Sequence, residues 1–399
     1  MSIFAAVMTG KGTGAISTVQ VFGDSAEAVV KKMFKPKGTK PGEFKTGEIL
    51  LGTITDGNET IDQVTIGCEQ ADSFAIHCHG NPLIVADIMQ LLQRRGATLL
   101  TAEQLLTKII SAQKTVNTIA VEAKLAQMKA KTIQGTKIII NQIDTGLSKK
   151  AAEWLANINA ISLEQISAEA ERILENSRTA KLIIAGCTVA LIGPPNSGKS
   201  TLLNYLAGRQ KAIVTDIKGT TRDWVEAVCR IESLSLRLID TAGLEEKLSA
   251  PKDTIEEAAQ KKSVQILEQA DLVMLVLDNS QTNDQLDERL VEKIAEKLVL
   301  TCLNKSDLPA KFDTSKFIRR GGLPEILSNT VQISAKEGIG IENLIGKIRQ
   351  VCGVVDFDLK TPVVFTSRQE NLLNQLKKTK SRKQAVSIIT ELLNGRLRV

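Results

Sequence analysis

At residues 193–200 the chain reads Gly-Pro-Pro-Asn-Ser-Gly-Lys-Ser, after an apolar run and before a helix-like one. This spacing of two glycines, a lysine and a serine is typical of the phosphate-binding loop that joins a strand to a helix. Glycines let backbone amides wrap around phosphates, and the positive helix end adds to the attraction. Lys199 would reach the β- and γ-phosphates, and Ser200 would ligate Mg²⁺. The stretch therefore predicts a nucleotide-binding α/β domain.

Apolar strand-like runs alternate with helix-like segments around this loop. The runs cover residues 187–192, 234–239, 272–277, 298–303 and 331–333. Alternation of this kind predicts a layered α/β sheet, which we expect to occupy residues 185–356.

The run at 234–239 ends in a motif that faces the phosphates. Residues 238–243 read Leu-Ile-Asp-Thr-Ala-Gly, so that Asp240 can hold the water shell of Mg²⁺ and the Gly243 amide can sense the γ-phosphate. Many small GTPases place a water-positioning glutamine next, but here Leu244 occupies that place. Another group must therefore position the attacking water.

Two further loops predict the base that is bound. Residues 304–307 read Asn-Lys-Ser-Asp, and the carboxylate of Asp307 can pair with two N–H donors that guanine offers and adenine does not. Residues 334–336, Ser-Ala-Lys, can offer backbone donors to the guanine carbonyl. The sequence therefore predicts a GTPase rather than an ATPase.

Length and composition indicate several domains. A chain of 399 residues with 43% apolar content is long enough for two or three cores. No apolar run approaches the roughly 18 residues of a membrane span, and residues 1–10 lack a signal peptide pattern, so we expect a cytoplasmic protein without membrane contact. The six cysteines have no metal or redox spacing, and we interpret them as reduced structural thiols.

The remaining segments differ in pattern from the middle of the chain. Strand-like runs at 16–22, 64–68 and 74–78, followed by a helix-like run at 83–95, predict a small α+β domain at 1–115.

Helical spacing of apolar residues marks the segments that flank the α/β domain. It recurs at 106–131 and at 162–176, where Ser162 and Gln165 form a capping-box pattern, and it returns after Pro362. We therefore expect an α/β domain inserted into an all-α domain made of residues 116–184 plus 357–399.

The end of the chain is basic. Residues 367–399 carry eight basic and two acidic residues. A basic terminal helix could follow the phosphates of RNA, and a solvated helix face is the alternative interpretation.

Residues 212–223, Ala-Ile-Val-Thr-Asp-Ile-Lys-Gly-Thr-Thr-Arg-Asp, together with Asn196 and Leu244, resemble the MnmE/TrmE family of tRNA modification GTPases. Looser similarity covers residues 12–23, 74–82 and 366–369. The resemblance implies a potassium-activated GTPase that forms a homodimer and works with the flavoprotein MnmG on the wobble uridine of certain tRNAs.

The resemblance also assigns residue roles. It implies a K⁺ site at Asn196, Thr215, Ile217 and Thr220, where other GTPases place an arginine finger, and an Mg²⁺ site at Ser200 and Thr221. It implies that Glu256 positions the attacking water. Glu257 is the alternative because residues 245–253 are lengthened here, and both glutamates could simply face solvent. The expected contacts of GTP or GDP are Asn196, Ser197, Gly198, Lys199, Ser200, Thr201, Thr215, Thr220, Thr221, Asp240, Gly243, Asn304, Lys305, Asp307, Ser334, Ala335 and Lys336.

Departures from the family pattern concern its folate site and its tail. Gln20 stands where the family has arginine, Ala71 where it has glutamate, and Thr115 near an expected lysine. Residues 111–114 read Ser-Ala-Gln-Lys instead of the family's Asn-Gly-Lys, and residues 395–399 lack a Cys-x-Gly-Lys tail. We therefore expect no folate binding. The alternative function is a GTP-driven switch or regulatory paralogue that has lost tRNA modification.

His77-Cys78-His79 is a weaker pattern. Alternate residues of a strand share a face, so the two histidines could chelate a metal, but no further ligand cluster accompanies them in the sequence. We expect no metal there.

Overall fold

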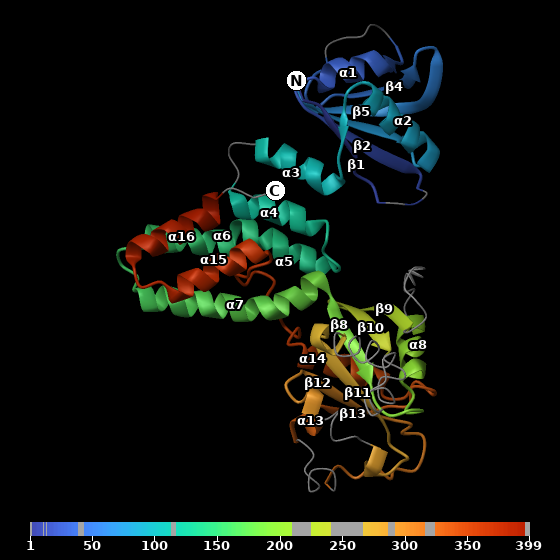
Figure 1. The fold of residues 1–399 in the computed structure, drawn as a ribbon, viewed down its shortest axis with the longest axis vertical. Coiled ribbons are helices and arrows are strands. Elements are labelled where there is room, and N and C mark those ends of the chain that lie inside the picture. The colour runs from blue at the N-terminus through green and yellow to red at the C-terminus, as the bar shows by residue number, and fades with distance from the viewer. Residues whose placement is uncertain are drawn as a thin grey trace, which may run out of the picture. The chain divides into compact units, whose positions relative to one another are not determined.

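A computed structural model describes residues 2–10, 12, 14–38, 44–112, 117–209, 225–240, 266–285, 292–315 and 324–395 (Figure 1). The chain divides into two units between Asn117 and Thr118. Each unit has hydrophobic cores of its own.

The first unit is built on a seven-stranded sheet with the order β3-β4-β5-β6-β2-β1-β7. The strands are β1 Phe4–Val7, β2 Ile16–Phe22, β3 Phe34–Pro36, β4 Ile49–Asp56, β5 Glu59–Gln70, β6 Ser73–His79 and β7 Thr98–Leu99. Neighbours are antiparallel except β1 and β7. The predicted strands therefore fall within β2, β5 and β6.

The two faces of this sheet are covered differently. Alternate residues such as Val64, Ile66 and Phe74 are buried in a core with α1 Ala26–Met33 and α2 Pro82–Arg94, where α2 begins after the capping residue Asn81. On the other face, α3 Ala102–Ala112 packs on β1, whereas Ile49 and Leu51 of β4 stay 71% and 45% exposed. The part of that face formed by β4 is therefore exposed.

The second unit begins with four helices, α4 Thr118–Gln127, α5 Ile133–Asp144, α6 Leu147–Ala156 and α7 Leu163–Ala185. Of these, α4, α6 and α7 share a core with two later ones, α15 Ser367–Lys378 and α16 Arg382–Asn394. Trp154, Leu373 and Ile389 lie in this core. The predicted capping box is confirmed, because Ser162 and Gln165 exchange side chain to backbone hydrogen bonds of 3.1 and 3.0 Å at the start of α7.

Two helix predictions were wrong in their boundaries. The run at 106–131 is divided between α3 and α4, because Leu105 and Ile109 face the first unit whereas Ile119 faces the helical core. The basic terminal segment forms two helices, since Thr379 ends α15 in an extended conformation.

A buried carboxylate joins three of these helices. Glu122 of α4 is 4% exposed and accepts hydrogen bonds from Thr366 at 2.8 Å, from Nε and Nη2 of Arg368 at 2.8 Å, and from Gln369 at 2.7 Å. Arg368 also donates to the backbone oxygens of Glu391 and Leu392 in α16. The guanidinium of Arg368 is thus paired with a carboxylate within the helical part.

The α/β part of the second unit is a six-stranded sheet with the order β13-β12-β11-β8-β10-β9. Its strands are β8 Cys187–Ile192, β9 Val225–Ile231, β10 Leu234–Asp240, β11 Leu272–Asp278, β12 Val299–Asn304 and β13 Thr330–Gln332. The helices whose bounds the structure describes are α8 Lys199–Arg209, α13 Pro324–Ser328 and α14 Ile341–Val351, with a short turn, η1 Asn283–Gln285. The five predicted strands are shifted by one residue at most, whereas β9, antiparallel to β10, was not predicted.

Residues on the two sheet faces alternate between two cores. Leu191, Leu238 and Val276 pack with α8 and α14 on one face, whereas Ile192 and Leu277 belong to a second core on the other. The chain enters and leaves this part at neighbouring points, because the buried thiols of Cys187, at the start of β8, and Cys352, just after α14, lie close enough to shift each other's pKa in opposite directions. Gly186 and Gly353, beside them, have φ of 90° and 67°.

Among the described residues no helix is long and apolar enough to cross a membrane. All six cysteines are buried as free thiols.

Candidate nucleotide site

Five strands of the six-stranded sheet, β8, β10, β11, β12 and β13, run parallel, so their carboxyl-terminal ends lie at the same edge of the sheet. The chain order reverses around β8, which lies between β11 and β10. Ligands of open α/β sheets bind at such a reversal. The loop at 193–200 is therefore at the position where a ligand is expected.

Two glycines shape this loop. Gly193 has φ of 142°, and an added Cβ would collide with the backbone oxygen of Val276. Gly198 has φ of 95°, and an added Cβ would collide with the side-chain nitrogen of Asn304. Only glycine fits both places, so the backbone can form a close cradle.

Two polar side chains lie inside the cradle. Lys199 is 9% exposed, and its ammonium donates to the backbone oxygen of Gly193 and, at 2.9 Å, to that of Pro194. The hydroxyl of Ser197 is buried and has no hydrogen-bond partner in the described part of the chain. A buried polar atom needs a partner, and a phosphate oxygen would supply one. The loop therefore fits a phosphate group.

Oxygen ligands for Mg²⁺ meet next to the loop. The hydroxyl of Ser200, in the first turn of α8, donates to Asp240 Oδ2 at 2.6 Å, and Asp240 is 1% exposed at the end of β10. Hydroxyl and carboxylate oxygens are ligands that Mg²⁺ prefers. The arrangement fits the predicted metal. Thr201 follows on α8 and is exposed.

Asn304 joins the phosphate loop to the loop after β13. Its amide nitrogen donates to the backbone oxygen of Ser197 at 2.8 Å, and its amide oxygen accepts from the backbone nitrogen of Ala335 at 2.9 Å. Asn304 is 3% exposed at the end of β12. One buried side chain therefore holds together the two loops that would contact opposite ends of a guanine nucleotide.

Lys305, the residue after Asn304, is held by an ion pair. Lys305 has φ of 62°, and its ammonium pairs with Asp278 Oδ2 at 2.7 Å. Burial opposes ionisation of Asp278, but hydrogen bonds from Lys305 and Ser280 outweigh it and hold the pKa of this carboxyl below its ordinary value.

Asp307 is exposed, and a hydrogen bond from the Ser334 side chain is the main cause that lowers the pKa of its carboxyl. Lys336 is also exposed, and its ammonium lies 3.5 Å from Glu337. An ionised Asp307 is thus available to accept two N–H donors of a ligand.

Several predicted site residues lie outside the described residues. They are Thr215, Ile217, Thr220, Thr221, Gly243 and Glu256, with the alternative Glu257. Their assigned roles remain predictions. Asn196, the described member of the K⁺ set, is exposed with φ of 62°.

Asp278 is a site residue that the sequence analysis missed. It ends β11, a strand buried along its whole length, and its carboxylate fixes Lys305 beside the base-binding loop. An acidic residue at the end of a buried strand was the available signal.

The histidines of the first unit have partners of their own. His77 Nδ1 lies 2.9 Å from the hydroxyl of Thr18, and His79 Nδ1 lies 2.7 Å from Asp62 Oδ1. Among the described residues no group of three or more potential metal-binding side chains is present.

Comparisons with known proteins cover both units. Residues 188–305 match the family model described as 50S ribosome-binding GTPase, and residues 3–104 match the one described as GTP-binding protein TrmE N-terminus. The chain is 31% identical over 410 residues to the tRNA modification GTPase MnmE of Lacticaseibacillus paracasei, covering 94% of this chain and 86% of that protein. It is 32% identical over 412 residues to that of Bacillus thuringiensis subsp. konkukian, covering 94% and 87%. A solved structure, the G domain of the T. maritima FeoB iron transporter, is 29% identical, covers 41% of this chain and 98% of that one, and has a TM-score of 0.30.

Proposed function

The chain belongs to the MnmE family of tRNA modification GTPases, and on this premise we propose that it hydrolyses GTP to drive modification of the wobble uridine in certain tRNAs. The carrying observation is Asn304, which holds the phosphate loop and the loop at 334–336 together through two hydrogen bonds. The site that results has a phosphate cradle at one end and an ionised carboxylate, Asp307, at the other.

Each part of the site has a role in hydrolysis. The backbone amides of 193–200 and the ammonium of Lys199 would hold the phosphates, which replaces the contacts of Lys199 with the loop's own carbonyls. Ser200, Asp240 and Thr221 would hold Mg²⁺, and Asn196, Thr215, Ile217 and Thr220 would hold K⁺. When bound, these cations supply positive charge beside the transferring phosphoryl group. Glu256 would orient the attacking water.

We further propose that the α/β part, residues 185–356, is inserted into a helical domain formed by 116–184 and 357–399, and that 1–115 is the N-terminal domain. Support comes from the core that α7 shares with α15 and α16. Gly243, whose amide would sense the γ-phosphate, lies in this inserted part. A change of the nucleotide bound to the α/β part would thereby be transmitted to the helical domain through the two neighbouring chain connections.

We propose a homodimer formed through the first unit. The partly uncovered sheet face presents Ile49 and Leu51, and Ile16 is 65% exposed. Exposed apolar side chains on an open sheet face are typical of an interaction surface. An MnmG-like flavoprotein is the second partner that family membership suggests.

For tRNA we propose contact at the turn between α15 and α16. Arg368 and Lys377 are engaged with Glu122 and Glu171, so they contribute little free charge. Lys378, Lys380 and Lys383 remain exposed around the turn. Lysines of this kind bind phosphates through release of counterions.

A second candidate function is supported by Gln20. The side chain of Gln20 is buried and donates to Glu69 Oε2 at 2.8 Å and to the Ser73 hydroxyl at 3.0 Å. No cation is offered at the place where the family resemblance expects an arginine. The alternative is therefore a GTP-driven regulator without folate-dependent chemistry. Ala71 has no charge to offer either, and Thr115 lies outside the described residues.

Two measurements separate these functions. Loss of the modified wobble uridine from tRNA of cells lacking this chain supports the modification function, whereas unchanged modification favours the regulator. Calorimetric titration with 5-formyl-tetrahydrofolate should show no binding. A micromolar dissociation constant would show that the chain binds folate although Gln20 replaces the arginine.

A further inference from the structure

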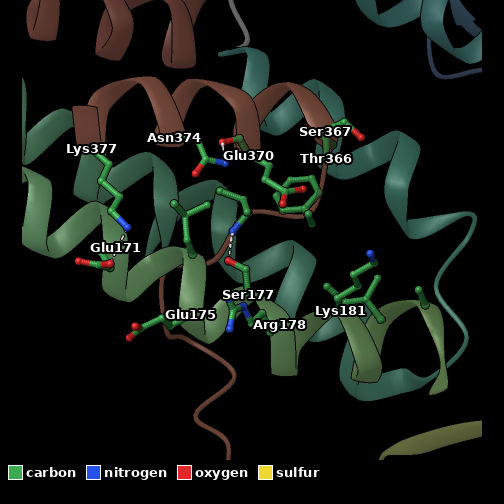
Figure 2. Close-up of a pocket in the computed structure, with 15 residues that line it drawn as sticks. Glu171, Glu175, Ser177, Arg178, Lys181, Thr366, Ser367, Glu370, Asn374 and Lys377 are labelled. Carbon is green, nitrogen blue, oxygen red and sulfur yellow. Dashed lines mark hydrogen bonds and ion pairs between the residues drawn. The ribbon is translucent and has the colours of Figure 1, made fainter. Parts of the chain in front are cut away.

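A cavity of about 420 Å³ lies between helices α7 and α15 (Figure 2). One face of each helix forms a wall, because its residues recur every three or four positions. From α7 these include Glu171, Arg178 and Lys181, and from α15 they include Ser367, Glu370 and Lys377. None of these residues belongs to the proposed GTP site.

One end of the cavity is closed by contacts between the two helices. Figure 2 shows Lys377 reaching across to Glu171, and the two side chains pair at 2.5 Å. The hydroxyl of Ser167 also donates to the backbone oxygen of Lys377 at 2.8 Å. The helices are therefore fixed together at this end.

The floor is apolar and its polar atoms are satisfied. In the segment that leads into α15, the backbone nitrogen of Val364 donates to the Ser177 hydroxyl at 2.8 Å. That hydroxyl donates in turn to the backbone oxygen of Ile173 at 2.5 Å. The half-buried ring of Phe365 and the side chain of Leu174 line the rest. A planar apolar group could lie on this floor without losing hydrogen bonds.

Away from the closed end, charged groups of the walls are unpaired. Within the described ranges the exposed cations Arg178 and Lys181 make no ion pair or hydrogen bond, and neither does the carboxylate of Glu370. Three residues separate Arg178 from Lys181 on α7, so their side chains start about 5 to 6 Å apart. Two cations at this spacing can hold a single phosphate group.

We propose that this cavity binds a nucleotide distinct from the GTP of the α/β part. Arg178 and Lys181 would hold its phosphate, and the ring of Phe365 would contact its base. The carboxylate of Glu370 and the amide of Asn374 would pair with N–H and C=O groups at the base edge. The volume lies within the range of about 300 to 1,000 Å³ that is usual for ligand pockets. The ligand is either a free mononucleotide or one nucleotide of a single-stranded RNA.

The test uses the full chain loaded with GDP, so that the guanine site is filled. The four 5′-ribonucleoside monophosphates, the matching nucleosides and a labelled pentauridylate are titrated separately by calorimetry or fluorescence anisotropy. We expect a monophosphate or the pentauridylate to bind, and nucleosides to bind at least about tenfold more weakly, because they lack the phosphate.

Variants identify the cavity as the binding place. Arg178→Gln combined with Lys181→Gln should weaken binding about tenfold or more, and Glu370→Gln should change the preference among bases. Lys124→Gln is the matched control, because Lys124 is an exposed lysine of α4 that lies outside both the cavity lining and the turn between α15 and α16. All these residues are exposed, so the melting temperatures should be unchanged.

Each outcome decides the proposal. Binding of monophosphates identifies a free-nucleotide site, and binding of pentauridylate alone, with the same sensitivity to the double variant, identifies an RNA nucleotide. Absence of saturable binding by every probe, or equal binding by the double variant and the wild type, overturns the inference. Lys199→Ala should abolish GTP hydrolysis while leaving this cavity intact, so failure of the GTPase assignment is measured independently.

Discussion

Replacing Asn304 by alanine should separate the phosphate loop from the base-binding loop. The change removes hydrogen bonds of 2.8 Å to the Ser197 oxygen and 2.9 Å from the Ala335 nitrogen. Both backbone groups belong to residues that are 2% exposed or less, so water does not readily replace the lost partner. Each buried backbone group left without a hydrogen-bond partner costs about 1 to 3 kcal/mol of free energy, so the two together cost about 2 to 6 kcal/mol.

This cost is shared between stability and nucleotide affinity. Two losses are expected: one in the unfolding free energy of the nucleotide-free chain and one in the free energy of GTP binding. Together they should amount to at least about 2 kcal/mol, which equals about 30-fold in a single equilibrium constant. Urea unfolding and titration with a fluorescent GTP analogue measure the two parts. Asn157→Ala is the control, because the exposed Asn157 side chain donates only to Glu153 O one helical turn away. If Asn304→Ala behaves like this control in both assays, the loops are not held by Asn304.

Four further predictions test other parts of the chain. Asp307→Ala should weaken GTP binding by about two orders of magnitude through loss of the guanine contact, and equal affinity of the wild type for ATP and GTP would contradict this. Asn196→Ala should abolish faster hydrolysis in K⁺ than in Na⁺ while GTP still binds; a wild-type rate that is equal in both salts would refute the K⁺ site. Asp278→Asn should lower the unfolding free energy at neutral pH, because the pKa of Asp278 is lower in the folded than in the unfolded chain. The stability that this carboxylate contributes is present above its unfolded pKa of about 3.9 and is lost as the pH falls through the folded pKa. Urea unfolding should therefore show a difference between wild type and variant that shrinks below about pH 4. Glu122→Ala should lower the unfolding free energy by about 3 to 5 kcal/mol, because the guanidinium of Arg368, 21% exposed, loses its carboxylate; a change below 1 kcal/mol would show that the network adds little.

The α/β part could be predicted well because its signals are local. The central strands β8, β11 and β12 are largely apolar runs, and the site motifs lie at or just after strand ends, so position in the sequence determines position at the sheet edge. The edge strand β9 was missed because its apolar residues alternate with Glu226 and Arg230, a weaker pattern than a continuous run.

Contacts between distant segments could not be predicted in this way. Glu122 and Arg368 are 246 positions apart, and nothing near either residue indicates the ion pair between them. Asp278 and Lys305 likewise meet only because β11 and β12 are neighbours in the sheet. The division between α3 and α4 also depends on tertiary structure, because the helical spacing of apolar residues continues while the core that they contact changes.

The closeness of Cys187 and Cys352 determines how easily the α/β part could be exchanged. It shows that the first strand and the last helix of the α/β part meet, so this part begins and ends at nearly the same point of the host. A segment with adjoining ends can be gained or lost as a cassette, because the host chain then closes over a short gap at little entropic cost. Gly186 and Gly353, both with positive φ, lie at the two crossings, so a short linker placed between them would join α7 to the segment that leads into α15.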